Sequence, residues 1–325
     1  MINPLPTHPV GRTALQVPRV GFGTAPLVTA PGWRGGDPIT EAQALQALQY
    51  AYDEGIRFFD TAPAYVRGLA ETRTGKLLGQ LPREQFVVAT KVGIDITGDE
   101  VRRDYSRDGV LRSLEGSLKR LQVDHVDILH VHDPDDYGRQ VLDETFPALA
   151  ELRTQGVIKA IGAGMNQWRV PMEFAQHADF DCFMIAGRYT LLEQGALPFF
   201  DLCYEKGIAI FAASIYNSGI LATGAASPHA AYNHAPPSAE IIARVQAIEA
   251  VCREFDIPLH TAATQFPYGH PAVKSIVAGF QHPNEVRACL NALQQTIPSS
   301  LWERLRETRQ LDSTIPISSM KVIGS

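Results

Sequence analysis

Residues 57–65 read RFFDTAPAY, and the rest of the chain is organised around this stretch. Phe58 and Phe59 have the character of a buried strand, which ends on the Asp60 carboxylate. A short turn then presents the phenol of Tyr65. Polar side chains directly after an apolar core strand are typical of the mouth of a parallel barrel, where barrel enzymes carry out their chemistry. The stretch therefore predicts a candidate active site at the carboxyl end of a core strand.

Two further apolar stretches end in the same way. Residues 86–91 (FVVATK) are apolar until they reach Lys91, and residues 126–132 (VDILHVH) end on His132. The carboxyl ends of parallel barrel strands meet at one face of the barrel. We therefore expect Asp60, Lys91 and His132 to lie together above a dry core, with Tyr65 just beyond the first strand.

Strands and helices alternate along the whole chain. The first helix is predicted from a capping box of Thr40 and Gln43, and Gly55 ends it. The remaining expected elements are a hairpin in 5–19, strands at 20–23, 159–164, 182–186, 208–213 and 275–278, helices near 69–78, 108–121, 141–155, 169–177, 197–206, 238–255, 259–266, 284–295 and 299–310, and a long loop at 217–237. About eight strands without a linker favour one domain over 1–325, an α/β fold of the (β/α)8 TIM-barrel type with an N-terminal hairpin and an extra C-terminal helix.

Composition narrows the class of protein. The chain has 325 residues, of which 45% are hydrophobic, and this is enough for one large core. Its 29 basic and 35 acidic side chains give a net charge of −6 without a basic stripe, so nucleic acid is not an expected partner. No apolar run reaches the roughly 18 residues that a membrane span needs. Four separated cysteines are expected to be reduced core residues of a cytoplasmic protein: Cys182, Cys203, Cys252 and Cys289. The protein is expected to be a monomer or a dimer.

Four separated motifs in this order resemble the aldo-keto reductase superfamily. They are FDTA (59–62) with Tyr65, the strand that ends on Lys91, DHVD (124–127) and HDP (132–134). The resemblance implies that Tyr65 transfers a proton, that the Lys91 ammonium lowers the pKa of Tyr65, that Asp60 holds Lys91, and that His132 hydrogen-bonds the reacting oxygen. Each residue alone is explained as well by packing or an ion pair, and only their joint position predicts catalysis.

The resemblance also implies a nicotinamide cofactor. The positions that would contact it are Gly23, Thr24, Asn166, Arg188, Ser214, Ser218, Gly219, Leu221, Gly279, Gln281 and Glu285. Two glycine motifs, at 21–26 and 162–167, lack the third glycine of the Rossmann fingerprint, so a Rossmann fold is not expected. Glu285 stands near the basic positions of NADP-specific members, where a carboxylate repels a 2′-phosphate and accepts from a 2′-hydroxyl. NAD is therefore expected, with NADP possible because Arg287 is close in sequence.

Two segments resemble the aldose 1-dehydrogenase branch of the superfamily: 164–168 (GMNQW) and 214–219 (SIYNSG). This resemblance implies that a free sugar such as L-fucose, L-galactose or D-arabinose is oxidised at C1 to the lactone. The small-molecule sugar would be held by residues in the loops and strand ends around the site, namely Trp33, His130, Asp133, Tyr137 and Asn217. A pyridoxal 4-dehydrogenase, a general NADPH carbonyl reductase and a non-catalytic nicotinamide sensor remain alternatives.

Two other chemistries are compatible with parts of the pattern. His130 replaces an aliphatic residue of the family and lies on the same side of its strand as His132, so the pair could bind a metal together with Asp60. Further ligands at strand ends are not evident, and no metal is expected. Lys91 could form a Schiff base as in an aldolase. The pairing of Asp60 with Tyr65 favours proton transfer over this alternative.

Overall fold

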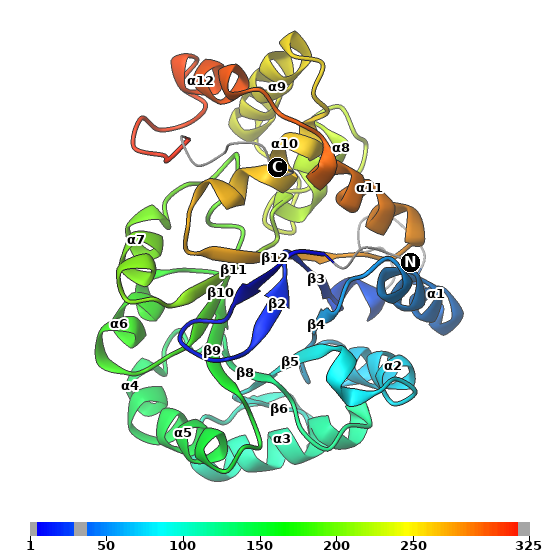
Figure 1. Ribbon diagram of the computed structural model, residues 1–325, viewed down its shortest axis with the longest axis vertical. Coiled ribbons are helices and arrows are strands. Elements are labelled where there is room, and N and C mark those ends of the chain that lie inside the picture. The colour runs from blue at the N-terminus through cyan, green and yellow to red at the C-terminus, as the bar shows by residue number, and fades with distance from the viewer. Residues whose placement is uncertain (1–4, 29–37, 318–325) are drawn as a thin grey trace.

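Eight parallel strands form a closed barrel in the middle of the fold (Figure 1). The computed structural model describes residues 5–28 and 38–317. Around the barrel the order is β10-β11-β12-β3-β4-β5-β8-β9. The strands are β3 (Val20–Gly23), β4 (Phe58–Asp60), β5 (Val87–Val92), β8 (Ile128–His132), β9 (Ala160–Met165), β10 (Cys182–Ala186), β11 (Ala209–Ala213) and β12 (Val273–Gly279). The predicted barrel is thus confirmed.

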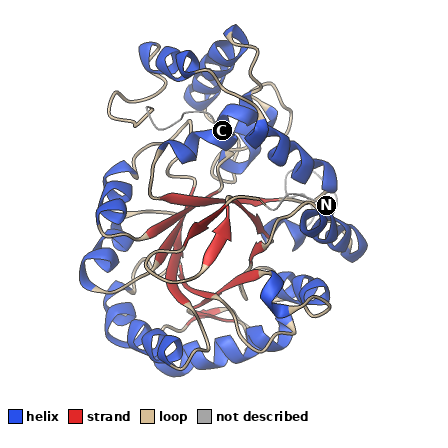
Figure 2. Ribbon diagram, in the orientation of Figure 1, coloured by secondary structure: helices blue, strands red, loops and turns tan. Residues whose placement is uncertain are grey.

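Helices surround the barrel and follow the expected order (Figure 2). They are α1 (Glu41–Asp53), α2 (Leu69–Leu78), α3 (Arg107–Leu121), α5 (Phe146–Thr154), α6 (Arg169–His177), α7 (Leu197–Glu205), α9 (Ala239–Glu254), α10 (Leu259–Gln265), α11 (Pro283–Gln294) and α12 (Ser299–Glu307). The capping box of α1 is present, since the Gln43 amide donates to Thr40 Oγ1 over 3.3 Å and the Thr40 amide to Gln43 Oε1 over 2.9 Å. In the part of the chain that is described, no helix is both long and apolar enough to cross a membrane.

The N-terminal hairpin closes one end of the barrel. Strands β1 (Thr7–Pro9) and β2 (Gln16–Pro18) pair in antiparallel fashion, as the sequence predicts. Val10 and Val17 are fully buried and pack with Phe58 and Ile128, which lie at the amino ends of β4 and β8. The hairpin therefore seals the end opposite the candidate site with apolar side chains.

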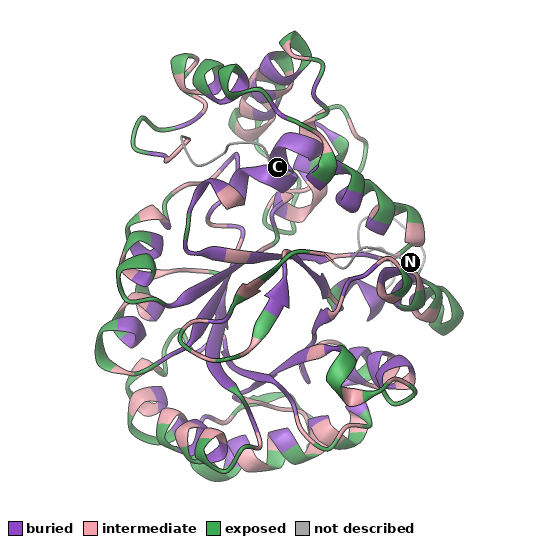
Figure 3. Cartoon of the chain, in the orientation of Figure 1, coloured by how far each residue is buried: buried purple, intermediate pink, exposed green. Residues whose placement is uncertain are grey.

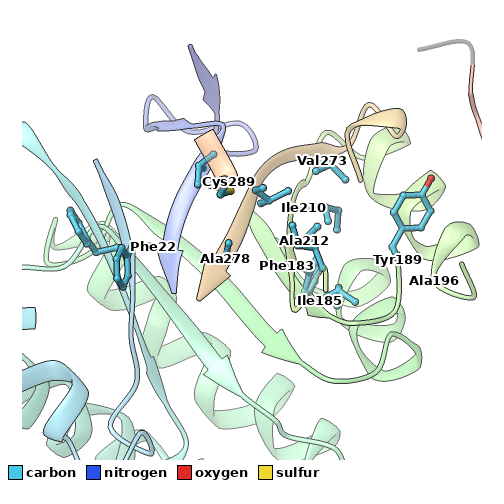
Figure 4. Packing of buried hydrophobic residues seen from close by; sticks show 14 of the residues in the cluster. Phe22, Phe183, Ile185, Tyr189, Ala196, Ile210, Ala212, Val273, Ala278 and Cys289 are labelled. Atoms are coloured by element: carbon cyan, nitrogen blue, oxygen red, sulfur yellow. The ribbon is translucent and has the colours of Figure 1, made fainter. Parts of the chain in front are cut away.

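Side chains of the barrel strands alternate between two apolar clusters. Phe183 and Ile185 of β10 belong to the larger cluster between strands and helices (Figure 4), whereas Cys182 and Met184 belong to the smaller cluster inside the barrel. Nearly all residues of the eight barrel strands are consequently buried (Figure 3). This pattern is expected where a parallel sheet is covered on both faces.

The structure differs from the expectation in three connecting regions. The segment 217–237 is not only loop, because it contains the short 3-10 turn η5 (Asn217–Gly219) and helix α8 (Ile220–Thr223). A second hairpin, β6 (Ile94–Asp95) with β7 (Arg102–Arg103), follows β5. The helix predicted near 141–155 starts earlier, with α4 (Gly138–Gln140), and reaches α5 through the π-helical turn η4 (Val141–Thr145). Elements of two to four residues are too short to leave an apolar period in the sequence.

A close contact between α2 and α3 leads to a stability prediction. A Cβ at Gly75 would lie 2.2 Å from the backbone oxygen of Arg120. We expect Gly75→Ala to destabilise the fold by about 2 kcal/mol, because the two helices must move apart. Gly116→Ala is the matched control: its Cβ would meet only the movable guanidinium of Arg120, at 3.0 Å, so it should stabilise α3 by about 0.5 kcal/mol. Urea unfolding measures both, and equal effects would contradict the tight contact.

Candidate active site

The carboxyl ends of the barrel strands open into a cavity of about 530 Å³. Asp60 ends β4, Lys91 lies near the end of β5 and His132 ends β8, while Tyr65 follows in the turn after β4. All four side chains line this cavity. The structure therefore brings together the four residues that the sequence predicts to form one site.

The Lys91 ammonium lies at the centre of this group. Its Nζ is 2.7 Å from Asp60 Oδ2, 2.8 Å from the carbonyl oxygen of Thr61 and 3.2 Å from the Tyr65 hydroxyl. Burial favours the neutral amine, but the charges of Asp60 and Tyr65 and their hydrogen bonds outweigh it, so the pKa of Lys91 is raised. Lys91 is therefore a fixed cation that donates toward the phenol.

The pKa of Tyr65 differs from the expectation. Burial raises it above the usual value, and the nearby Lys91 ammonium opposes this shift without overcoming it. The prediction of a lowered pKa is therefore wrong for the net value, although the direction of the Lys91 contribution is as expected. Desolvation destabilises the phenolate more than the Lys91 ammonium stabilises it, because Asp60 already neutralises that ammonium. Tyr65 is consequently a phenol at neutral pH.

His132 faces Tyr65 across the cavity. The two rings lie 5.9 Å apart between centroids at an angle of 87°. Burial lowers the pKa of His132 well below its usual range, and the Lys91 charge adds to this effect. The Nε2 atom is 3.8 Å from Asp133 Oδ2, and Nδ1 has no hydrogen-bond partner within residues 5–28 and 38–317. His132 is thus a neutral imidazole with a single ring N–H available to donate.

His130, an expected substrate contact, lies beneath the cavity and does not line it. Its ring is fully buried in the barrel, edge-on to Phe211 at 6.2 Å between centroids. A Cβ at Gly162 would lie 2.2 Å from His130 Nδ1, so the glycine makes room for the ring. Burial and then the Lys91 charge lower the pKa of His130 well below its usual range. Among the described residues, no group of three or more metal-ligating side chains is suitably placed.

Seven of the expected cofactor contacts line the cavity: Gly23, Asn166, Ser214, Ser218, Gly219, Gly279 and Glu285. The cavity wall carries little side-chain bulk near the four central residues. A Cβ at Gly164 would lie 3.4 Å from Lys91 Cε, and Ala213 lines the same space. At the far end, Glu285 Oε2 accepts from the Gln281 amide over 2.6 Å and so caps the start of α11.

Four of the expected cofactor contacts lie behind the wall of the cavity. Thr24 and Leu221 are fully buried, and Gln281 Nε2 donates to the carbonyl of Pro26 over 3.3 Å. Arg188 pairs with Glu193 Oε1 at 2.7 Å and donates from Nε to the backbone oxygen of Asn166 over 2.8 Å. Arg188 therefore supports the backbone of a cavity residue instead of reaching the cavity itself.

Among the expected substrate contacts, Asp133 alone of the described ones lines the cavity. Trp33 lies outside the described residues. Tyr137 is exposed and packs on Tyr105, with 4.9 Å between the ring centroids. Asn217 is buried, and its Oδ1 accepts a hydrogen bond from the Thr190 hydroxyl over 2.6 Å. Tyr216 and His234, from the loop after β11, also line the cavity. Four further cavity residues were not predicted, because local patterns do not distinguish them from core residues: Met184, His260, Phe280 and Cys289.

Comparison with known proteins places this site in a family. A model described as the aldo/keto reductase family matches residues 19–310, and the chain therefore belongs to that family. Its members are oxidoreductases that use nicotinamide cofactors. Among solved structures, an aldo-keto reductase from Bacillus halodurans in its holo form superposes with a TM-score of 0.78 at 25% identity, over 96% of this chain and 98% of that one.

Several characterised relatives are similar over nearly their whole length. The chain is 36% identical to a pyridoxal 4-dehydrogenase from Microbacterium luteolum, covering 91% of this chain and 95% of the relative. It is also 36% identical to a D-threo-aldose 1-dehydrogenase from Pseudomonas sp, covering 93% and 98%. An L-galactose dehydrogenase from Arabidopsis thaliana is 30% identical over 88% and 87%. These similarities confirm the resemblance to the aldose dehydrogenase branch.

The two buried histidines predict a loss of stability in acid. The folded chain holds His130 and His132 neutral, whereas the unfolded chain binds a proton at each below about pH 6.5. Each therefore lowers the free energy of unfolding by up to about 1.4 kcal/mol per pH unit below that value. We expect His130→Met to reduce this slope by about one such increment between pH 6 and 5 in urea unfolding. Measurements at pH 8 report the packing change alone, and an unchanged slope would mean that His130 is protonated in the folded state.

Proposed function

We propose that this protein oxidises a free aldose of the L-fucose, L-galactose or D-arabinose type at C1 to the lactone, with NAD as the hydride acceptor. The observation that carries the proposal is the contact of the Lys91 ammonium with both Asp60 and the Tyr65 hydroxyl in a cavity that His132 also lines. Relatives named for aldose and galactose oxidation support the sugar as substrate. The four cysteines are buried and carry free thiols, which accords with a cytoplasmic location.

The chain's own residues would handle the proton and the developing charge. Tyr65, as phenolate, would accept the proton of the anomeric hydroxyl while the C1 carbonyl forms. Lys91 would stabilise the phenolate, and neutral His132 would donate to the same substrate oxygen. Asp60 would keep Lys91 charged and in place. When bound, the nicotinamide supplies the acceptor for the hydride that leaves C1.

The cavity also fits the proposed cofactor. Gly23 and Gly164 leave space on the strand ends that a side chain would narrow, because their Cβ atoms would meet Val277 at 3.3 Å and Lys91 at 3.4 Å. Asn166, Ser214, Ser218 and Gly219 would hold the nicotinamide and pyrophosphate portions, since they line the cavity.

NAD is proposed over NADP because of the charges at the far end of the cavity. Glu285 lines this end, and its carboxylate would repel a 2′-phosphate. Arg287, the nearby cation, donates from Nε to the Tyr50 hydroxyl over 2.9 Å and does not line the cavity. This contact, which holds Arg287 outside the cavity, supports NAD as the proposed cofactor.

A second candidate substrate is pyridoxal, favoured by the relative named pyridoxal 4-dehydrogenase at 36% identity. The proposed roles of Tyr65, Lys91 and His132 would be unchanged. Absorbance at 340 nm with NAD or NADP and a panel of aldoses, pyridoxal and simple alcohols tests both. Reduction of NAD by pyridoxal but by no aldose would replace the proposed substrate, and turnover of neither would reject both.

Tyr65→Phe should separate an enzyme from a nicotinamide sensor. We expect the substitution to lower kcat by about 10²–10⁴-fold while NADH binding, followed by fluorescence, is retained.

In the wild type, the rate of oxidation should rise about tenfold per pH unit between pH 7 and 9, because the raised pKa of Tyr65 keeps the phenolate a minor species there. Unchanged turnover in the variant, or a plateau below pH 8 in the wild type, would contradict the role of Tyr65.

Glu285→Gln tests the cofactor preference. The amide keeps an oxygen that can cap α11 and removes the negative charge, so kcat/KM with NADP should rise about tenfold relative to NAD. Asn284→Asp, at the exposed neighbouring position, adds a carboxylate that does not line the cavity and is the matched control. A wild-type preference for NADP would contradict the proposed role.

A further inference from the structure

Asp133, directly after His132, has an unusual backbone conformation. Its φ of 42° lies in the left-handed region, which is uncommon for residues other than glycine and is visited occasionally by asparagine and aspartate. Surrounding groups hold it there: its amide donates to the Gly164 carbonyl over 3.0 Å, and its own carbonyl accepts from Arg103 and from the Tyr105 hydroxyl, the latter at 2.9 Å. Such strain, fixed from several sides, is commonly found at functional sites.

The Asp133 carboxylate, which lines the cavity, is only partly satisfied by the protein. Its donors belong to Asn166, whose side-chain amide lies 3.3 Å and 3.4 Å from the two oxygens and whose backbone N–H also donates to the carboxylate. His132 Nε2 is 3.8 Å away, beyond hydrogen-bond range. Within residues 5–28 and 38–317 no lysine or arginine forms an ion pair with these oxygens, since Arg103 bonds the backbone carbonyl instead. The side chain is 25% exposed, so a ligand in the cavity can reach its lone pairs.

The carboxylate also lies close to where the reaction is proposed to occur. His132 is the proposed donor to the reacting oxygen, and Asp133 Oδ2 is 3.8 Å from the nitrogen that would donate. Oxygens on neighbouring carbons of a polyol are separated by about one hydrogen-bond length. An acceptor beside His132 is therefore placed to bind the hydroxyl that neighbours the reacting carbon.

We propose that Asp133 accepts a hydrogen bond from a hydroxyl adjacent to the reacting carbon, and that it selects hydroxy-substituted carbonyl compounds and their lactols as the substrate class. The inference rests on the proposed function for its reacting oxygen. An aldose carries such a group, the C2 hydroxyl, whereas the phenolic hydroxyl of pyridoxal lies one carbon further from its reacting formyl carbon. A hydrogen bond to a charged acceptor is worth about 1.5–3 kcal/mol, or roughly 10–150-fold in kcat/KM.

The experiment uses the full chain, both nicotinamide cofactors and two pairs of compounds. D-arabinose and its 2-deoxy form (2-deoxy-D-ribose) are compared in oxidation, and lactaldehyde and propanal in reduction. The wild type should favour the hydroxylated member of each pair by about 10–100-fold. Asp133→Asn should reduce kcat/KM for the hydroxylated members by a similar factor and leave the others nearly unchanged. Asparagine tolerates the left-handed region, so the fold should be kept.

Asp135→Asn is the matched control, because Asp135 is an exposed neighbouring carboxylate that does not line the cavity. It should leave the preference for the hydroxyl unchanged. Equal turnover within each pair by the wild type, or an equal loss on both members in Asp133→Asn, would overturn the inference and leave Asp133 as a residue that only positions His132. If lactaldehyde is preferred through Asp133 but no aldose is oxidised, the proposed substrate fails and the inference holds. If none of the four compounds reacts, both are rejected.

Discussion

The buried ion pair of Lys91 and Asp60 is the interaction on which the site depends. Removing two charges from water costs several kcal/mol for each ion, so the pair is tolerated only where its geometry is fixed and its remaining donors are satisfied. Adjacent strands provide this geometry, since β4 pairs with β5 in a register that places Asp60 opposite Ala89 and leaves Lys91 two residues further along. A shift of one residue would turn Lys91 toward the helices. The register of β4 and β5 therefore fixes the position of the Lys91 ammonium.

The turn after β4 transmits this constraint to Tyr65. Val66, Arg67 and Gly68 all have positive φ angles, which are unfavourable for the first two. Arg67 offsets this strain by donating to the carbonyl of Ile96 over 3.0 Å and to that of Asp99 over 3.1 Å, in the β6–β7 hairpin. The hairpin, which has no apolar period of its own, thus holds the turn that presents the phenol to Lys91.

The two ends of the cavity differ from its centre in charge. The centre holds a cation, Lys91, that is already neutralised by Asp60, and a neutral imidazole. A carboxylate lies beside each end, Asp133 next to His132 and Glu285 at the start of α11. Such a distribution favours uncharged ligands rich in hydroxyl groups and disfavours additional phosphates, because carboxylates accept hydrogen bonds from hydroxyls and repel anions. The proposed sugar substrate and the proposed preference for NAD would therefore both follow from one electrostatic pattern.

The sequence by itself determined the barrel, the capping box of α1 and the grouping of Asp60, Tyr65, Lys91 and His132, because these follow from local periodicity and from where apolar strands end. Tertiary structure decided what depends on burial and on contacts between distant residues. It raised the pKa of Tyr65 and placed His130 beneath the cavity. It also directed Arg188, by its contact with a residue 22 positions away, to the backbone of Asn166. Desolvation and such long-range contacts leave no mark on local sequence, since they exist only once the barrel has closed.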